Sequence, residues 1–452
     1  MRVRQLVPIF VLSILLLPLA SGGVMRDTTL MPPPWNHCLG IRKVTQFHLD
    51  LYSGYSAEFD DPQGLFCIKL DSKDDPETDR DDDELTVFGL NSGAHQLIYN
   101  KGLTSIGIVG RGGSGPMEFS NPISITGDTA GNIYVADAGN DRILHLRYLE
   151  NDELVQVGEM KGEEDDLLAN PTGVSLSGGR LYVADSGNDR IVVFDQKGNL
   201  IERLAPRTVT ARLVRPLTVA AVTEGEDWLY YSDHFIAVVD SLGKRLWKLT
   251  PEGKVQGVAI YPNREGGFGH IAIDYYGNIY VTDPVHGCIH KFNRHLDYIM
   301  AFGGEETGRF DEPRGITIYR RFGQIFVSER AGAQYYWIGT DIIRYTARNL
   351  TLDLSRRIIG VDVSFLLTEH SFVSLHLEDE KGRELVRILG DYLLPAGTFE
   401  RRLELPYSDL EPLANCKLRL VIVAKPTYSS RAYHTVTEKS RPLEAELTHN
   451  PN

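Results

Sequence analysis

The sequence predicts an all-β protein, with a six-bladed β-propeller followed by a small β-sandwich. The first observation is a near-exact repeat: GNIYVADAGNDRI begins at Gly131, and GRLYVADSGNDRI begins 48 positions later at Gly179. The second is composition, because 43 glycines and 22 prolines are typical of many short strands joined by turns. The third is that the repeated motif does not recur after residue 339, although apolar and polar residues continue to alternate as they do in strands.

Each repeat unit is expected to consist of a strand, a tight turn and a second strand. Apolar and polar residues alternate in it up to a Gly-Asn pair, and these two residue types favour tight turns. Weaker copies are EDWLYYSDHFIAVVD, GNIYVTDPVHGCIHKF and GQIFVSERAGAQYYWI. The motif carboxylates are expected at Asp137, Asp185, Asp233, Asp283 and Glu329, and one step earlier the position falls on Gly89. A period of 40–50 residues with further strands on both sides predicts four-stranded blades over residues 43–340. We expect Lys43–Tyr52 to close the ring as the outer strand of the sixth blade.

The repeated motif resembles the NHL repeat, on the pattern GxIYVADxGNDRI with a following FDxxGN. The segments GSGPMEFSNPISI and TGRFDEPRGITI resemble the linkers between blades in that family. The resemblance implies a propeller. It leaves function open, because such propellers serve as binding platforms, as sensors and occasionally as enzymes.

Residues 341–425 are expected to form the sandwich. The segments VSLHLEDEKGRELVRIL and LPAGTFERRLEL resemble an immunoglobulin-like domain of the type found in secreted bacterial proteins and in the flagellar hook-capping protein. The Trp-Asp-Gly segment usual in that family is replaced by PYSDLEPL. The polar residues 426–452 are expected to form a flexible tail.

Residues 1–22 read as a secretory signal peptide. Two arginines precede the apolar segment Leu6–Ala20, which is too short to span a bilayer, and small residues follow it. We therefore expect a secreted, periplasmic or cell-envelope protein. Removal of the two arginines changes the formal charge from −14 to −16, which disfavours nucleic acid and allows at most peripheral membrane association. In such a compartment Cys38 and Cys67 either pair or remain as two buried thiols.

The carboxylates of the repeat, together with Arg142 and Arg190, are interpreted as scaffold. A catalytic site requires one blade to differ, whereas these residues recur. Each carboxylate is expected to accept hydrogen bonds from its own turn, and each arginine is expected to pair with the neighbouring blade. A cation-binding acidic ring is the alternative. The turns between second and third strands share a rim with the linkers between blades, and this rim is the expected binding face.

Function is sought where the repeat breaks, at Gly89, His234, Cys288 and Glu329, and at His270 on an inner strand. Related propellers include zinc lyases, so His234, His270 and His286 are a hypothetical set of metal ligands, although their spacing matches no metal motif.

The function expected is a non-enzymatic scaffold that binds a protein or a polysaccharide and needs no cofactor. The alternative is a lyase or lactonase with zinc or calcium at the channel mouth. The acidic segment Asp71–Glu84 is expected to be a solvated loop, with weak calcium binding as the alternative. The sequence does not indicate an oligomeric state.

Overall fold

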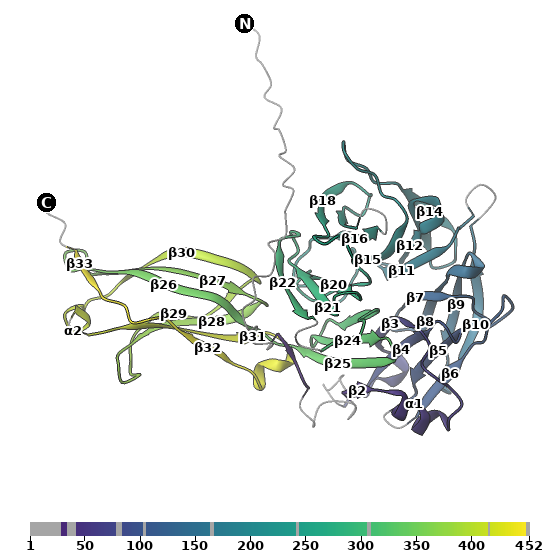
Figure 1. The fold of residues 1–452 in the computed structure, drawn as a ribbon, viewed down its shortest axis with the longest axis horizontal. Coiled ribbons are helices and arrows are strands. Elements are labelled where there is room, and N and C mark those ends of the chain that lie inside the picture. Colours follow the sequence, from purple (N-terminus) through teal and green to yellow (C-terminus); the bar gives the residue numbers. More distant parts are fainter. Residues whose placement is uncertain are drawn as a thin grey trace, which may run out of the picture.

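The computed structural model describes residues 29–33, 42–77, 84–102, 105–162, 167–240, 244–304, 309–414 and 416–448. The predicted signal peptide and Cys38 lie outside these residues, and Cys67 is buried in the first blade. The prediction of an all-β chain with a propeller and a small sandwich is confirmed (Figure 1). Over the same ranges, no helix has the length and apolar character needed to cross a membrane.

Six antiparallel sheets form the blades. The first blade contains β3 (Pro62–Lys69), β4 (Leu85–Asn91), β5 (Gln96–Asn100) and β6 (Ile106–Val109), and the second contains β7 (Pro122–Gly127), β8 (Asn132–Asp137), β9 (Arg142–Tyr148) and β10 (Leu154–Met160). The third contains β11 (Pro171–Ser177), β12 (Arg180–Asp185), β13 (Arg190–Asp195) and β14 (Leu200–Leu204), and the fourth contains β15 (Pro216–Val222), β16 (Phe235–Asp240), β17 (Arg245–Leu249) and β18 (Val255–Ile260). The fifth contains β19 (Ile271–Ile273), β20 (Ile279–Asp283), β21 (Cys288–Phe292) and β22 (Tyr298–Gly303). The first strand of each blade contacts the first strands of its two neighbours, which produces a closed ring. Buried residues between the sheets, such as Tyr134 and Trp247, form the core.

The sixth blade joins the two ends of the propeller. It contains β23 (Ile316–Tyr319), β24 (Gln324–Glu329) and β25 (Gly332–Ile338), and β25 pairs with both β1 (Leu30–Met31) and β2 (Lys43–Val44). The expected closing strand is therefore correct only at its first two residues. Residues Gln46–Ser53 form helix α1 instead, because Thr45 starts a helix by donating its backbone N–H to His48 Nδ1 at 3.2 Å.

The second domain is a sandwich of two four-stranded sheets. One contains β26 (Ile342–Asp353), β27 (Ile358–Leu367), β30 (Gly397–Pro406) and β33 (Glu446–Thr448), and the other β28 (Ser371–Glu378), β29 (Glu384–Leu394), β31 (Arg419–Pro426) and β32 (Val436–Lys439). The short helix α2 (Glu411–Ala414) precedes β31. The expectation of a flexible tail from residue 426 fails for residues 426–448, because β32 and β33 each complete one sheet.

Candidate functional site

The motif carboxylates hold the blades together. Asp137 is fully buried and accepts the backbone N–H of Ser120 at 2.6 Å and the guanidinium Nε of Arg142 at 2.8 Å. Asp185 makes the same pair of contacts, with the backbone N–H of Ala169 and with Arg190. Each carboxylate thus joins the turn of its own blade to the linker that enters the blade.

The motif arginines extend this connection. Arg142 donates to the carbonyls of Ser114, Gly115 and Glu118 in the preceding linker and forms an ion pair with Glu159. The expectation that the arginine pairs with the neighbouring blade is therefore only partly met. Its charged partners lie within its own blade, and its contacts to the linker are hydrogen bonds to carbonyls.

The register predicted for two blades needs correction. In the fourth blade Asp240, not Asp233, pairs with Pro216 and with Arg245, as Asp137 pairs with Pro122 and Arg142. Asp233 lies at the opposite end of β16, where it is half-exposed and forms an ion pair with Arg294. In the first blade the equivalent residue is Asn91 rather than Gly89, and it accepts the linker N–H of Asp60 at 2.7 Å. The fixed period failed because the fourth blade carries an insertion. The spacing from Asp240 to Arg245, which equals that from Asp137 to Arg142, was the signal in the sequence.

Glu329 follows the same plan in the sixth blade. It is buried and accepts the backbone N–H of Asp311 at 3.0 Å and the side-chain amide of Gln334 at 2.5 Å. Lys43 forms an ion pair with it from the closing strand β2. Through these contacts, Glu329 joins the sixth blade to β2, the closing strand near the start of the chain.

Neighbouring inner strands pack closely against each other at one end of the propeller axis. The inner strands approach each other so closely there that a Cβ at Gly64, Gly173 or Gly315 would collide with the backbone of a neighbouring inner strand. This end lies near the rim that carries the motif turns and the linkers between blades.

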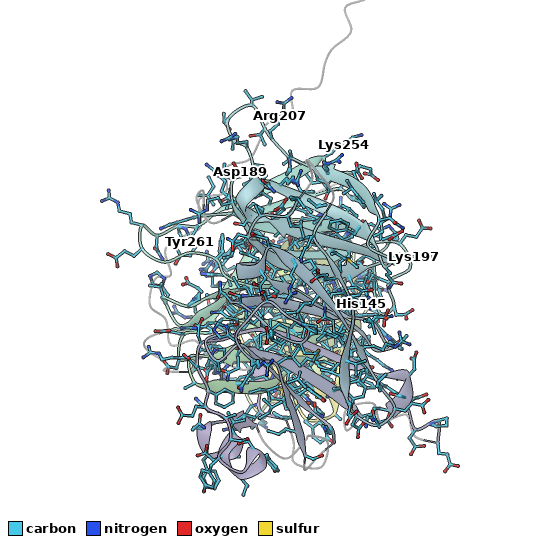
Figure 2. All side chains as sticks on the ribbon, turned by 90° about the vertical axis from the view of Figure 1, so that its right-hand side faces the viewer. His145, Asp189, Lys197, Arg207, Lys254 and Tyr261 are labelled. Carbon is cyan, nitrogen blue, oxygen red and sulfur yellow. The ribbon has the colours of Figure 1, made fainter. Side chains whose placement is uncertain are left out.

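A hollow of about 910 Å³ lies along the inner strands towards the other rim. Its lining begins at the inner strands and ends in the loops between first and second strands, and it includes Asp128, Gly179 and Arg320. The two rims lie on opposite sides of the propeller in Figure 2, where Asp189 marks the turn rim and Lys197 the opposite one. The hollow therefore opens away from the rim that the sequence indicated as the binding face.

Two long loops face each other across this mouth. The loop between β3 and β4 lies in the first blade, the loop between β15 and β16 in the fourth, and these blades are opposite each other in a ring of six. The first loop contributes Asp71 and Asp74 to the lining, which places part of the acidic segment at the mouth. The second contributes the sequence Glu224–Trp228. We call the hollow and these two loop segments the channel mouth.

The channel mouth is acidic and carries one exposed aromatic ring. Its charged lining residues are Lys69, Asp71, Asp74, Asp128, Glu224, Glu226, Asp227, Arg320 and Arg321. Trp228 is 47% exposed, and the guanidinium of Arg321 lies 4.7 Å from the centre of its ring. Glu226 forms an ion pair with Arg320, whereas the side chains of Glu224 and Asp227 are exposed. The sequence does not single out Trp228, because a fixed period places the insertion that carries it inside the repeat unit.

The three candidate histidines do not converge. His270 lines the channel and is buried, and burial lowers the pKa of its imidazole to about 4. His234 precedes β16 at the mouth rim, whereas His286 lies in the turn after β20 at the opposite rim. The hypothetical set of His234, His270 and His286 is therefore not formed. His286 instead contacts Asp283, at 3.1 Å between Nδ1 and Oδ2.

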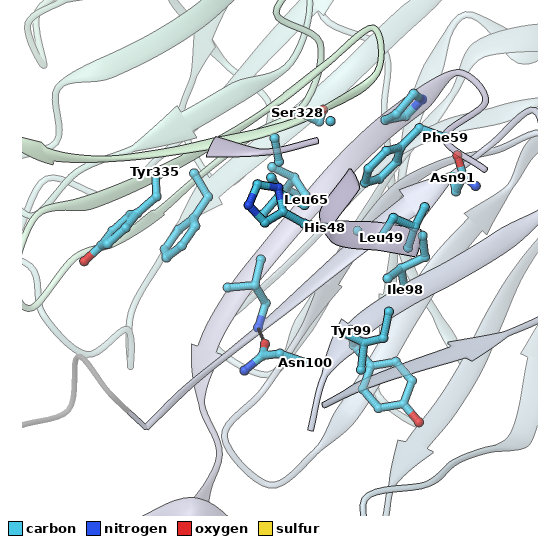
Figure 3. A pocket seen from close by; sticks show the side chains of 18 of the residues that line it. His48, Leu49, Phe59, Leu65, Asn91, Ile98, Tyr99, Asn100, Ser328 and Tyr335 are labelled. Atoms are coloured by element: carbon cyan, nitrogen blue, oxygen red, sulfur yellow. Dashed lines mark hydrogen bonds between the residues drawn. The ribbon is translucent and has the colours of Figure 1, made fainter. Parts of the chain in front are cut away.

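A second, smaller cavity of about 210 Å³ lies where the ring closes. Helix α1 borders it with His48 and Leu49, and the first and sixth blades contribute residues such as Leu65 and Tyr335 (Figure 3). Its lining is mainly apolar, and the cavity belongs to the joint between the first and last blades.

Comparison with known protein families supports the interpretation of the repeated motif. The NHL repeat family matches residues 168–194, which include the second copy of the motif. Among solved structures, a catalytically inactive virginiamycin B lyase from Staphylococcus aureus with quinupristin is 15% identical, with a TM-score of 0.40 over 56% of this chain and 76% of the other. A streptogramin B lyase is 11% identical, with a TM-score of 0.41 over 65% and 96% of the two chains. No curated protein matches the chain significantly.

Proposed function

We propose that this chain is a non-enzymatic binding module, secreted or held in the cell envelope, that takes up a basic segment of a protein partner at the channel mouth. The observation that carries the proposal is the acidic hollow of about 910 Å³ flanked by loops from opposite blades. A cleft whose lining carries an excess of one charge concentrates ligands of the opposite charge. The module requires no cofactor for this binding and does not bind nucleic acid.

Two kinds of contact support a cationic ligand. The exposed carboxylates of Glu224 and Asp227 can accept hydrogen bonds from lysine or arginine, and Trp228 offers a ring face to a cation. The sandwich, which resembles an immunoglobulin-like module, would present the propeller at the cell surface, peripheral to the membrane at most.

A lyase or lactonase is not favoured by the described lining of the channel, in which His270 is the one histidine. A polysaccharide ligand is retained as an outcome of the test. Titration of the full chain with an oligolysine peptide, an oligoglutamate peptide and a neutral oligosaccharide, followed by tryptophan fluorescence and calorimetry, separates these possibilities.

Of these three ligands, we expect only the oligolysine peptide to show saturable binding. Neutralising Glu224 and Asp227 together should weaken it by up to about fivefold per charge, since an exposed charge pair contributes up to about 1 kcal/mol. Trp228→Ala should also weaken it, while Asp409→Asn on the sandwich should not. Preferential binding of the oligosaccharide, or equal binding by the neutralised variant, would overturn the proposal.

A further inference from the structure

The fifth blade departs from the others at its motif carboxylate. Asp283 occupies the position of Asp137, but Cys288 stands where Arg142 stands in the second blade. Asp283 nevertheless remains 1% exposed. A buried carboxylate that has lost its cationic partner requires another source of positive charge or hydrogen bonds.

Three side chains with metal-binding atoms surround that carboxylate. Asp283, Cys288 and His290 are all buried, and their ligand atoms lie within 4.8 Å of one another. The distance from His290 Nε2 to Asp283 Oδ2 is 3.2 Å, and from Cys288 Sγ to His290 Nε2 it is 3.8 Å. In a tetrahedral zinc site the corresponding ligand–ligand distances are about 3.4 Å and about 3.6 Å, given the usual zinc bond lengths. Two of the three distances are thus close to those around one zinc ion, and the third, between Asp283 and Cys288, is at most 4.8 Å.

We propose that Asp283, Cys288 and His290 bind a transition-metal ion, zinc(II) in the first place, and that the side chain of His286 turns from Asp283 and Tyr261 towards the ion to become the fourth ligand. His286 Nδ1 lies 3.1 Å from Asp283 Oδ2, and its side chain is 35% exposed, which provides a path for the ion. The mixture of thiol, imidazole and carboxylate suits zinc and disfavours calcium and magnesium. On binding, the Cys288 thiol releases its proton to solvent and its sulfur bonds to the metal.

A purely structural role for His290 explains less of the arrangement. Trp247 in the fourth blade and Gln334 in the sixth occupy the same position, and each donates one neutral N–H to a carboxylate that also has a cationic partner, Arg245 or Lys43. His290 can do the same through Nε2, but that nitrogen also contacts the Cys288 sulfur at 3.8 Å. In addition, a structural role requires neither the thiol of Cys288 nor the second imidazole of His286.

Further contacts orient the carboxylate. The Tyr261 hydroxyl donates to Asp283 Oδ2 at 2.6 Å, and the backbone N–H of His286 donates to Oδ1 at 3.1 Å. Hydrogen bonds of this kind fix the direction of ligands around a metal. Tyr261 belongs to the linker between the fourth and fifth blades, so the ion would secure this turn to that linker. The site lies on the rim opposite to the channel mouth and is independent of the proposed peptide binding.

Metal titration of the chelator-treated full chain tests the proposal. We expect one equivalent of Zn²⁺ to bind and raise the melting temperature, and Co²⁺ to give a thiolate-to-metal charge-transfer band. Cys288→Ser should abolish that band, whereas Cys416→Ser should retain it. His286→Ala, at a partly exposed position, should fold normally and bind Zn²⁺ at least tenfold more weakly.

X-ray absorption of the zinc-loaded wild-type chain provides a readout that does not depend on the folding of any variant. One sulfur among nitrogen and oxygen ligands supports the site. A shell without sulfur, the absence of one-equivalent binding, or a charge-transfer band that persists in Cys288→Ser would overturn it.

Discussion

Lys291 of β21 and Glu369 of the sandwich form an ion pair in which both side chains are fully buried. Lys291 Nζ also donates to the carbonyl of Thr368 at 2.7 Å, and Tyr280 donates its hydroxyl to Glu369 at 3.0 Å. The fifth blade therefore contributes a cation, and the sandwich a carboxylate, to one interface. Two domains joined in this way should unfold together rather than separately.

Breaking this pair should be costly. Glu369→Gln leaves the Lys291 ammonium buried without its counter-charge, and such losses amount to about 3–5 kcal/mol of unfolding free energy. Denaturant unfolding followed by circular dichroism measures it. The double variant Lys291→Met/Glu369→Gln should recover a large part of the loss, because neither charge of the pair then remains buried.

The matched control is an exposed ion pair in the sandwich. Arg387 and Glu384 are 58% and 38% exposed, so Glu384→Gln should cost at most about 1 kcal/mol. Equal effects of Glu369→Gln and Glu384→Gln would show that the interface does not depend on the buried pair.

The same interface should make stability depend on pH. Burial, together with the nearby charge of Glu369, raises the pKa of Asp274 to about 7 from 3.8. The folded state therefore holds a proton on Asp274 between about pH 4 and pH 7 that the unfolded state has released. The contribution of this group to the free energy of unfolding is therefore greatest at low pH. It falls by up to about 1.4 kcal/mol for each pH unit as the pH rises towards 7.

Asp274→Asn tests this pH dependence. The unfolding free energy of wild type relative to the variant should fall between pH 5 and pH 7.5, as measured by denaturant titrations at each pH. The exposed Asp71→Asn should leave the wild-type profile unchanged. A pH-independent difference between wild type and Asp274→Asn would contradict the shifted pKa.

The motif arginines should differ in importance according to burial. Arg142 is 3% exposed and Arg190 15%, although both pair with a fully buried aspartate. Arg142→Ala should destabilise by about 3–5 kcal/mol, because Asp137 loses its counter-charge and three linker carbonyls lose a donor. Arg190→Ala should cost less, and Arg111→Ala, at 80% exposure, less than about 1 kcal/mol. Thermal melts rank the three variants, and a reversed order would refute the assignment.

The architecture could be predicted because each blade repeats one local pattern. Alternation and the turn after Asp137 recur in register, so the blades could be counted from sequence alone. The insertion before Asp240 could not be placed by a fixed period, and Asp233 was selected because it preserved that period. Aligning on the spacing between aspartate and arginine would have avoided the error.

The candidate sites depended on contacts that the sequence does not contain. His286 was singled out, but its partners Asp283 and His290 were not grouped with it, because strand pairing brings them together. Trp228 became notable only when the ring placed its loop opposite the first blade. Residues 426–448 appeared loose because strands as short as β33 carry little alternation.

The final prediction concerns the joint between the first and last blades. A Cβ at Gly315 would collide with the carbonyl of Gln63, which also accepts a hydrogen bond from Ser328 at 2.6 Å. Gly315→Ala should therefore force the first and sixth blades apart and cost about 1–3 kcal/mol, as overpacking does. Gly267→Ala is the matched control, because no atom lies within 4 Å of its added Cβ, and it should stay within about 0.5 kcal/mol of wild type. Thermal and denaturant unfolding measure both variants. If Gly315→Ala were as stable as Gly267→Ala, the prediction would be wrong. The ring would then accommodate the added methyl group without loss of the contact between Ser328 and Gln63.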